Sequence, residues 1–417
     1  MNVKSIKTQI FCICIILMMS IVNAQGTWKV YTKDDGLKSN NISEIFKDSK
    51  GNLWFNTSDA VKKGIMKFDG KDWTSYYNKN SLASITTFFE DSKGTLWLGV
   101  YIPGTMYVNG LTKVNGDSFE RISKVGTKFI AEGSDGRLWF GAKNLLSYDG
   151  NSIIEHDKKE FWDGKIAALY CNNSGNIWVG TESGVASYDG KNWKVYSNVA
   201  NCPTNSVNSI ISDNQGNFWF GGEDGVYKYD GNNWQHFNKK DGLVGTPTLY
   251  IRIDSHDNVY AIAGIPEKEN VGIVHAIKLD VANDGLSIFE NGQWRPFNER
   301  EGVPYGLRSV FCEDKSGNLW FNSKDDAIYK FDGSSKTLFN ESNGFIGKYF
   351  GAMLEDSRGN YWFITAAGIA KFDGENWSYF NKDTGLPSNL IYSTIIEDNN
   401  GDIWFGSWKG VLKYTYE

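Results

Sequence analysis

The chain has 417 residues and a formal net charge of −6, from 43 basic and 49 acidic side chains. A mildly acidic chain without a block of Lys and Arg is a poor candidate for binding nucleic acid or an anionic membrane surface. Aromatic residues make up 15% of the sequence, so we expect burial of large rings to stabilise the fold.

The first 24 residues differ from the rest of the chain. Lys4 and Lys7 form a short basic start, Ile10 to Val22 is apolar, and small residues around Ala24 offer a cleavage site. This pattern is typical of a secretory signal peptide and is too short for a comfortable membrane span. We therefore expect residues 1–24 to be a signal peptide, residues 25–417 to form one exported domain in the periplasm or outside the cell, and no membrane span.

The remaining chain is an internal repeat, marked by variants of Gly-Asn-Leu-Trp-Phe. The central aromatic residue of each copy, called here the anchor, recurs roughly every 42 residues, with one longer interval after the sixth copy. The nine anchors are Trp54, Trp97, Trp139, Trp178, Trp219, Tyr260, Trp320, Trp362 and Trp404. The longer interval contains an insertion around residues 264–284, to which the pattern assigns no role.

Each unit contains four short β-rich runs separated by turn residues. In the fifth unit these runs begin at Val207, Phe218, Val226 and Trp234, with polar or Gly-containing turns between them. A four-strand unit of this length is typical of a β-propeller blade. We therefore predict an all-β fold, a single β-propeller of four-stranded antiparallel blades.

The stretch EDKSGNLWFN, residues 313–322, places two acids before the anchor and is open to three interpretations: a metal loop, a catalytic carboxylate pair or a turn. An Asp stands six residues before the anchor in seven units: Asp48, Asp91, Asp213, Asp254, Asp314, Asp356 and Asp398. An active site is normally built once, whereas Asp and Gly repeatedly satisfy the backbone of tight turns. We therefore favour a turn over a metal site or a catalytic site.

Asp-Gly or Asn-Gly pairs follow the third run of most units and fit a two-residue hairpin turn, which needs positive φ. Several are followed by a Trp four residues after the Asp: Trp73, Trp193, Trp234 and Trp377. We expect these indoles to pack between neighbouring units, and a stacking site for sugars is the alternative.

The two ends of the repeat region complement each other. The last unit stops at Glu417 without a fourth run, and residues 27–31 (TWKVY) supply such a run before the first complete unit. We predict that residues 27–31 complete the last blade and close the ring, which removes an exposed sheet edge. We expect nine blades; eight blades with the sixth unit displaced, or two small rings, are the alternatives.

The segments Glu397 to Gly406 and Gly368 to Gly374, together with Asp241-Gly242-Leu243, resemble the two-component regulator propeller repeat. Members of this family often form the periplasmic sensor region of hybrid histidine kinases in gut-type bacteria and recognise glycan fragments. The resemblance implies the propeller fold and binding of an extracellular ligand or partner, and it implies no catalytic residues. We expect no kinase or transmembrane part in this chain.

Propellers usually bind at the face where loops break the repeat. Such breaks predict a ligand-binding set on the face that carries the blade-to-blade links: Tyr101, Tyr107, Glu223, Asp224, Tyr305, Arg308, Trp408 and Lys409. Aromatic rings beside acids and bases suit a glycan or a peptide. The four histidines lack zinc-ligand spacing, so we expect no metal, no cofactor and no assigned catalytic residue.

Three functions fit the sequence. The leading hypothesis is an exported, non-enzymatic, monomeric propeller that binds a glycan, a peptide or a protein partner. The alternatives are a propeller enzyme, such as a lyase or a hydrolase with a site at the channel mouth, and a scaffold of a cell-surface complex. A cluster of His, Tyr or Arg at the channel mouth would favour the enzyme, and an exposed apolar patch would favour the scaffold.

Overall fold

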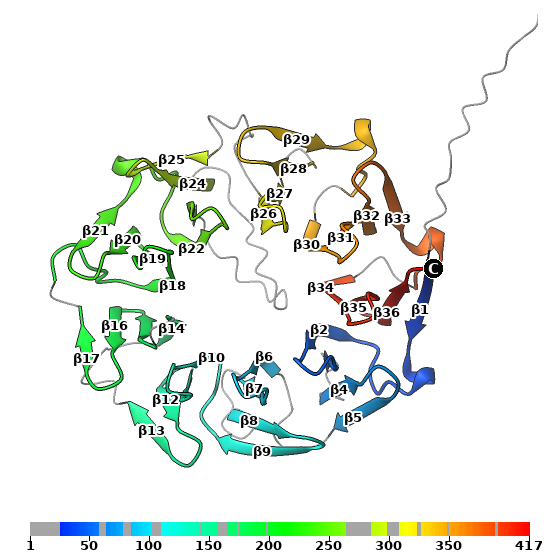
Figure 1. Ribbon diagram of the computed structural model, residues 1–417, viewed down its shortest axis with the longest axis horizontal. Coiled ribbons are helices and arrows are strands. Elements are labelled where there is room, and N and C mark those ends of the chain that lie inside the picture. Colours follow the sequence, from blue (N-terminus) through cyan, green and yellow to red (C-terminus); the bar gives the residue numbers. More distant parts are fainter. Residues whose placement is uncertain are drawn as a thin grey trace, which may run out of the picture.

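The computed structural model describes residues 26–57, 64–77, 85–101, 110–141, 143–156, 165–172, 175–196, 199–263, 285–297, 308–322, 327–347, 350–387 and 391–417. The expected signal peptide lies outside these residues. Within them, nine four-stranded antiparallel sheets stand around a central opening (Figure 1). The structure confirms the single nine-bladed propeller and excludes the eight-bladed and two-ring alternatives.

We number the blades in chain order, and each blade runs from the central opening outward. Blade 1 contains β2 (Ile42–Lys47), β3 (Leu53–Thr57), β4 (Gly64–Phe68) and β5 (Trp73–Tyr77). Blade 2 contains β6 (Ile85–Glu90), β7 (Leu96–Val100), β8 (Gly110–Asn115) and β9 (Ser118–Ser123). Blade 3 contains β10 (Phe129–Glu132), β11 (Leu138–Gly141), β12 (Leu145–Tyr148) and β13 (Ile153–His156). Blade 4 contains β14 (Ile166–Cys171), β15 (Ile177–Thr181), β16 (Gly184–Tyr188) and β17 (Trp193–Val195).

The remaining blades follow the same order. Blade 5 contains β18 (Val207–Ser212), β19 (Phe218–Gly222), β20 (Gly225–Tyr229) and β21 (Trp234–Phe237). Blade 6 contains β22 (Thr248–Ile253), β23 (Val259–Ala263), β24 (Gly285–Glu290) and β25 (Gln293–Pro296). Blade 7 contains β26 (Arg308–Glu313), β27 (Leu319–Asn322), β28 (Ile328–Phe331) and β29 (Lys336–Phe339). Blade 8 contains β30 (Phe350–Glu355), β31 (Tyr361–Thr365), β32 (Gly368–Phe372) and β33 (Trp377–Phe380).

Blade 9 joins the two ends of the chain. Its strands are β34 (Ile391–Glu397), β35 (Ile403–Ser407), β36 (Gly410–Thr415) and, from the N-terminal side, β1 (Thr27–Tyr31). β1 pairs with β36 antiparallel from Thr27↔Thr415 to Tyr31↔Val411. The predicted closing strand is therefore confirmed, and β36 gains a hydrogen-bonded neighbour instead of an open edge.

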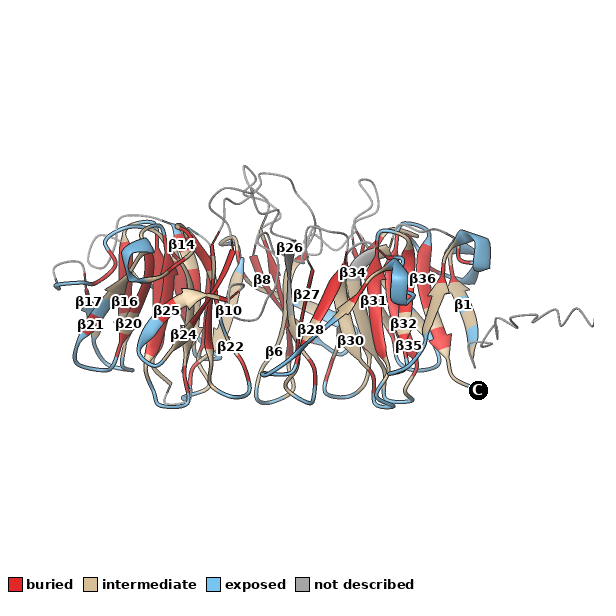
Figure 2. Cartoon of the chain, turned by 90° about the horizontal axis from the view of Figure 1, so that it is seen from above, coloured by how far each residue is buried: buried red, intermediate tan, exposed pale blue. Residues whose placement is uncertain are grey.

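The hydrophobic core lies between adjacent blades. In every blade except the sixth, the second strand is buried along its whole length, as in β3 and β35, because both of its faces pack against a neighbouring blade. The outermost strands are more exposed, as in β13. Figure 2 shows this distribution, with buried strands inside each blade and exposed turns at the two ends of the ring.

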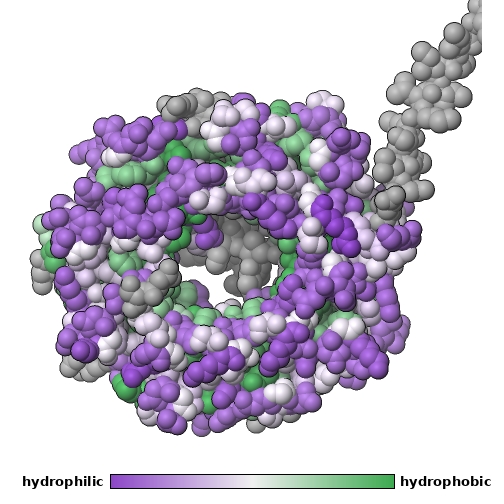
Figure 3. Space-filling view, viewed as in Figure 1, coloured by the Kyte–Doolittle hydropathy of each residue, from purple (hydrophilic) through white to green (hydrophobic). Residues whose placement is uncertain are grey.

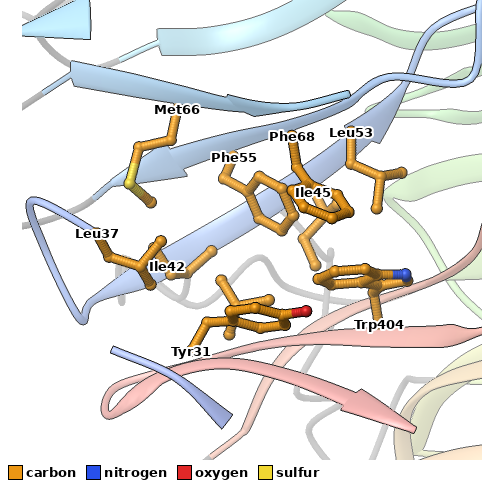
Figure 4. Close-up of a cluster of buried hydrophobic side chains, with 10 residues drawn as sticks. Tyr31, Leu37, Ile42, Ile45, Leu53, Phe55, Met66, Phe68 and Trp404 are labelled. Carbon is orange, nitrogen blue, oxygen red and sulfur yellow. The ribbon is translucent and has the colours of Figure 1, made fainter. Parts of the chain in front are cut away.

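Figure 4 shows the core between blades 9 and 1. Tyr31 of the closing strand stacks on Trp404 with ring centroids 5.6 Å apart, and Phe68 of blade 1 packs on the same indole at 5.1 Å. Both termini of the chain therefore contribute rings to one buried cluster, and this couples closure of the ring to burial of apolar surface.

The Asp-Gly turns differ in one respect from the expected two-residue turn with paired positive φ. In blade 1 the glycine takes the positive value, φ 99° at Gly70, while Asp69 Oδ1 accepts the backbone N–H groups of Lys71 and Asp72 at 3.0 and 2.8 Å. The carboxylate organises the turn from the position before the glycine. Asn291-Gly292 does have positive φ at both residues.

Among the described residues, no helix is long and apolar enough to cross a membrane. The helical elements there are 3₁₀ turns of three residues: η1 (Lys33–Asp35), η2 (Lys239–Asp241), η3 (Glu341–Asn343) and η4 (Lys382–Thr384). Cys171, Cys202 and Cys312 are free thiols.

Candidate functional site

The ring has two unlike faces. The turn face carries the turns between the first and second strands of each blade, such as 48–52, and those between the third and fourth, such as 69–72. The loop face carries the second-to-third strand loops, such as 223–224, and the links from one blade to the next. Figure 2 shows the exposed 3₁₀ turns on the opposite side of the ring from the regular hairpins.

The turn face is occupied by one repeated structural device. Asp314 Oδ1 accepts the backbone N–H groups of Ser316 and Asn318 at 3.0 and 2.8 Å, and its Oδ2 accepts the indole N–H of Trp320 at 2.9 Å. Burial acts to raise the pKa of Asp314, but hydrogen bonds from Trp320 and Asn318 outweigh it and hold the pKa below its ordinary value. The turn interpretation is confirmed, with the anchor indole as an additional partner.

Glu313, the acidic residue directly before Asp314, makes a different contact. Glu313 accepts the backbone N–H of Ser255, in blade 6, at 2.9 Å, and Glu90 accepts both the N–H and the hydroxyl of Ser49, in blade 1, at 2.7 and 2.6 Å. The two acids of EDKSGNLWFN therefore serve two connections: Glu313 joins the preceding blade and Asp314 builds its own turn. Sequence reasoning missed the connection between blades, because the partner lies about one repeat away.

On the loop face, several links between blades share one conformation, a capped 3₁₀ turn. In η2, Asn238 caps the turn by accepting the N–H of Lys240 at 2.9 Å, and Gly242 follows with φ 101°. Leu243 then turns inward and is buried. The Asp-Gly-Leu motif is thus a device for passing from one blade to the next.

Trp408 and Lys409 form the loop between β35 and β36. Trp408 is 52% exposed, which is unusual for so large an apolar side chain. The loop beneath it is fixed, because Ser407 Oγ accepts the backbone N–H of Lys409 at 3.1 Å and donates to the carbonyl of Gly410 at 2.8 Å. An exposed ring on a well-bonded loop is suited to contact a ligand with little loss of conformational entropy.

Glu223 and Asp224 form the equivalent loop of blade 5. Glu223 is exposed, and its backbone N–H donates to the carbonyl of Ser206. Asp224 Oδ2 accepts the side-chain amide of Asn205 at 2.7 Å, so its carboxylate is partly engaged by the neighbouring link.

The other predicted residues are spread around the ring. Tyr101 is half-buried at the end of β7, and Arg308 opens β26, where its backbone pairs with Asn322. Tyr107 and Tyr305 lie outside the described residues. The described candidates come from blades 2, 5, 7 and 9, so they mark a face and not one cluster.

One pair on the same face escaped the sequence analysis. Lys165 Nζ lies 3.0 Å from Glu182 Oε1, and both side chains are more than half exposed. The side-chain hydrogen bond with Glu182 raises the pKa of Lys165, and the same contact lowers the pKa of Glu182. Nothing in the sequence pairs these residues, because they come from different segments of blade 4.

The inner strands contain one unusual acid. Glu44 lies on β2, and burial raises its pKa to about 7, while a hydrogen bond from Asn56 acts in the opposite direction. Within the described part of the chain, no group of three or more His, Cys, Asp or Glu side chains is arranged to hold a metal ion.

Residues 36–59, 203–224 and 385–409 match the family model of the two component regulator propeller. These segments fall in blades 1, 5 and 9, and each spans a first-to-second strand turn with its anchor Trp. The chain carries two-component regulator propeller repeats. The three matched segments occupy equivalent positions in their blades.

The propeller is also similar to solved structures. One is the extracellular domain of the hybrid two component system BT3049 from B. thetaiotaomicron, at 15% identity over 93% of this chain and 83% of that one, with a TM-score of 0.34. Another is PorZ, a surface component of the type-IX secretion system of Porphyromonas gingivalis, at 14% identity over 89% and 68%, with a TM-score of 0.40. A third is virginiamycin B lyase from Staphylococcus aureus, at 12% identity over 94% and 99%, with a TM-score of 0.41. No curated protein sequence matches this chain.

Proposed function

We propose that this protein is an exported, non-enzymatic binding module whose loop face recognises a glycan. The observation that carries the proposal is the contrast between the two faces. The turn face repeats one hairpin with its acids engaged, whereas the loop face holds the exceptions to the repeat, including Trp408 at 52% exposure.

The chemistry of the loop face supports a sugar as the ligand. Trp408 presents a flat apolar ring, and Lys409 beside it is an exposed cation. A sugar ring combines an apolar C–H face with hydroxyl groups, so one ligand meets both side chains. Figure 3 views the ring from the opposite, turn face, whose described surface is largely hydrophilic.

A glycan array probed with the full chain tests this proposal. We expect binding to one glycan class, reduced at least tenfold by Trp408→Ala and also weakened by Tyr101→Ala. Ile154→Ala is the matched control, because Ile154 is an exposed apolar side chain on the outer strand β13 and should not affect binding.

Two results would overturn the proposal. One is binding that survives both aromatic substitutions while the variants melt at the wild-type temperature. The other is an array without any binder, which would return attention to a peptide or protein partner.

A further inference from the structure

Most junctions between blades share a pattern of two rings. The anchor of one blade receives a Trp from the fourth strand of the next blade: Trp193 on Trp139 at 5.9 Å, Trp294 on Trp219 at 5.9 Å, and Trp73 on Trp404 at 6.3 Å. The closing strand follows the same rule, with Trp28 on Trp362 at 6.3 Å. These rings fill the space between blades near the turn face.

A lysine often completes the pattern. The third-strand residue opposite the anchor places its ammonium near the ring, as in Lys228 over Trp219 at 4.9 Å and Lys330 over Trp320 at 5.3 Å. Lys330 Nζ also lies 3.7 Å from the buried carboxylate of Asp314. The lysine thus supplies positive charge beside the repeated Asp.

The junction between blades 6 and 7 departs from this pattern at all three positions. The anchor is Tyr260, and the residue opposite it is Ile288 in place of lysine. The fourth-strand position of blade 7, paired with Phe331, holds Lys336 in place of Trp. Lys336 is exposed, and its ammonium lies over Tyr329 of its own blade at 5.7 Å. This junction therefore contains neither tryptophan of the usual pair.

A cavity of about 540 Å³ occupies this junction. Its apolar wall comes from Tyr260, Ile288, Leu319 and Phe331, the residues that surround the vacant indole position. In the regular junction of blades 9 and 1, the residue equivalent to Phe331 is Phe68, which packs against Trp73 at 4.9 Å. The cavity therefore lies where the repeat elsewhere places a ring.

The rest of the lining is polar and carries excess negative charge. Asp254, Glu290 and Asp332 contribute three carboxylates, and Arg295 contributes a cation that pairs with Glu290 at 2.8 Å. Asp254 is almost fully buried and accepts the hydroxyl of Tyr260 at 3.0 Å and the amide of Asn258 at 2.8 Å. These three carboxylates and Arg295 give the described lining residues a formal excess of two negative charges.

We propose that this cavity is a binding site for a small organic cation, an aromatic ring joined to an ammonium group by a short alkyl chain. The ring takes the place of the Trp that Lys336 replaces, against Tyr260 and Phe331. The ammonium takes the place of the lysine that Ile288 replaces, beside Asp254. The excess of carboxylates disfavours binding of anions. A purely apolar ligand would cover polar groups of the lining without forming hydrogen bonds to them, which costs binding free energy.

This site is separate from the proposed glycan site. Its lining includes the first-to-second strand turn of blade 6 at 254–258 and the third-to-fourth strand turn of blade 7 at 332–334, so it belongs to the turn face. In Figure 1 the two blades are adjacent, with β24 and β25 on one side and β28 and β29 on the other. Failure of one proposal leaves the other standing, because the variants that test them do not overlap.

Isothermal titration of the full chain with tryptamine at low salt tests the inference. Tryptamine is the probe because it joins an indole to an ammonium group. We expect saturable one-to-one binding, and at least tenfold weaker binding of indole-3-propionate, which has the same ring and the opposite charge. Raising the salt concentration should weaken tryptamine binding.

Variants locate the site. Lys336→Trp restores the ring of the repeat and should abolish tryptamine binding, and Ile288→Lys restores the cation and should weaken it at least tenfold. Ile153→Trp is the matched control, because it adds an indole at the same repeat position in blade 3 and should leave binding unchanged. Absence of tryptamine binding, equal binding of the two indoles, or full binding to folded Lys336→Trp would each overturn the inference.

Discussion

Two junctions differ in how the same repeat positions are filled. The closing junction between blades 8 and 9 is packed with aromatic rings, and the junction between blades 6 and 7 contains a cavity. At the closing junction, Trp28 packs on Trp362, and Lys371 lies over that indole at 5.5 Å. At the other junction the corresponding residues are Lys336, Tyr260 and Ile288, and a cavity remains. The contrast shows that equivalent junctions of one ring can differ, with indole packing at one junction and a cavity at another.

The first prediction makes the closing junction resemble the hollow one. Trp28→Ala removes a ring that also packs on Phe380 at 5.0 Å and Tyr414 at 5.1 Å. We expect a loss of about 3–5 kcal/mol of unfolding free energy, the usual cost of truncating a large ring that packs in a core. Urea denaturation followed by fluorescence measures it.

Trp28→Phe is the control for this change. It keeps an aromatic ring and removes a buried indole N–H that has no hydrogen-bond partner. We expect a loss below half of that caused by Trp28→Ala. Equal stability of wild type and Trp28→Ala would mean that the closing strand contributes little to the ring.

A second prediction concerns the other side of the closing blade, where β2 of blade 1 contacts β34 of blade 9. Burial raises the pKa of Glu44 to about 7, well above its value in the unfolded chain. The folded state then binds the proton of Glu44 more tightly, so the contribution of Glu44 to stability is greatest below about pH 4.5 and is lost as the pH rises through 7. Glu44→Gln cannot ionise and should escape this fall, gaining about 3 kcal/mol at pH 8 relative to wild type.

Melting temperatures at pH 5 and pH 8 check this prediction. The difference between Glu44→Gln and wild type should be larger at pH 8 than at pH 5. Glu375→Gln, at an exposed turn position, should show no such difference between the two pH values. The same pH response in both variants would show that Glu44 does not carry the effect.

The smallest expected effect comes from repairing the hollow junction. Lys336→Trp is expected to add apolar contact with Tyr260 and Phe331, which line the cavity. We expect a gain of about 1 kcal/mol or less, because filling a cavity is partly offset by imperfect fit. A melting temperature below that of Ile153→Trp would argue that the cavity does not accept an indole.

Much of the fold follows from the sequence because its signals are repeated. The anchors predict the blades, and the Asp six residues before most anchors predicts a turn. Residues 27–31 are recognisable as the missing fourth strand of blade 9. Each signal is local, or is a copy of a local signal, so it needs no knowledge of distant contacts.

The sites depend on residues that are distant in the sequence. Glu313 resembles one half of an acidic pair until Ser255, 58 residues away, is seen to donate to it. The cavity requires Tyr260, Ile288 and Lys336 together, and these residues come from two adjacent blades and are far apart in the sequence. The unusual anchor Tyr260 was visible in the sequence, but its meaning depends on what faces it.

The most direct test of the account is a crystal structure of the Lys336→Trp variant. The account predicts that the new indole lies between Tyr260 and Phe331, as Trp294 lies on Trp219, and that the cavity of about 540 Å³ becomes smaller by the volume of the ring. An indole that points to solvent, with the cavity unchanged, would contradict the claim that this junction is hollow because it lacks the tryptophan of the repeat.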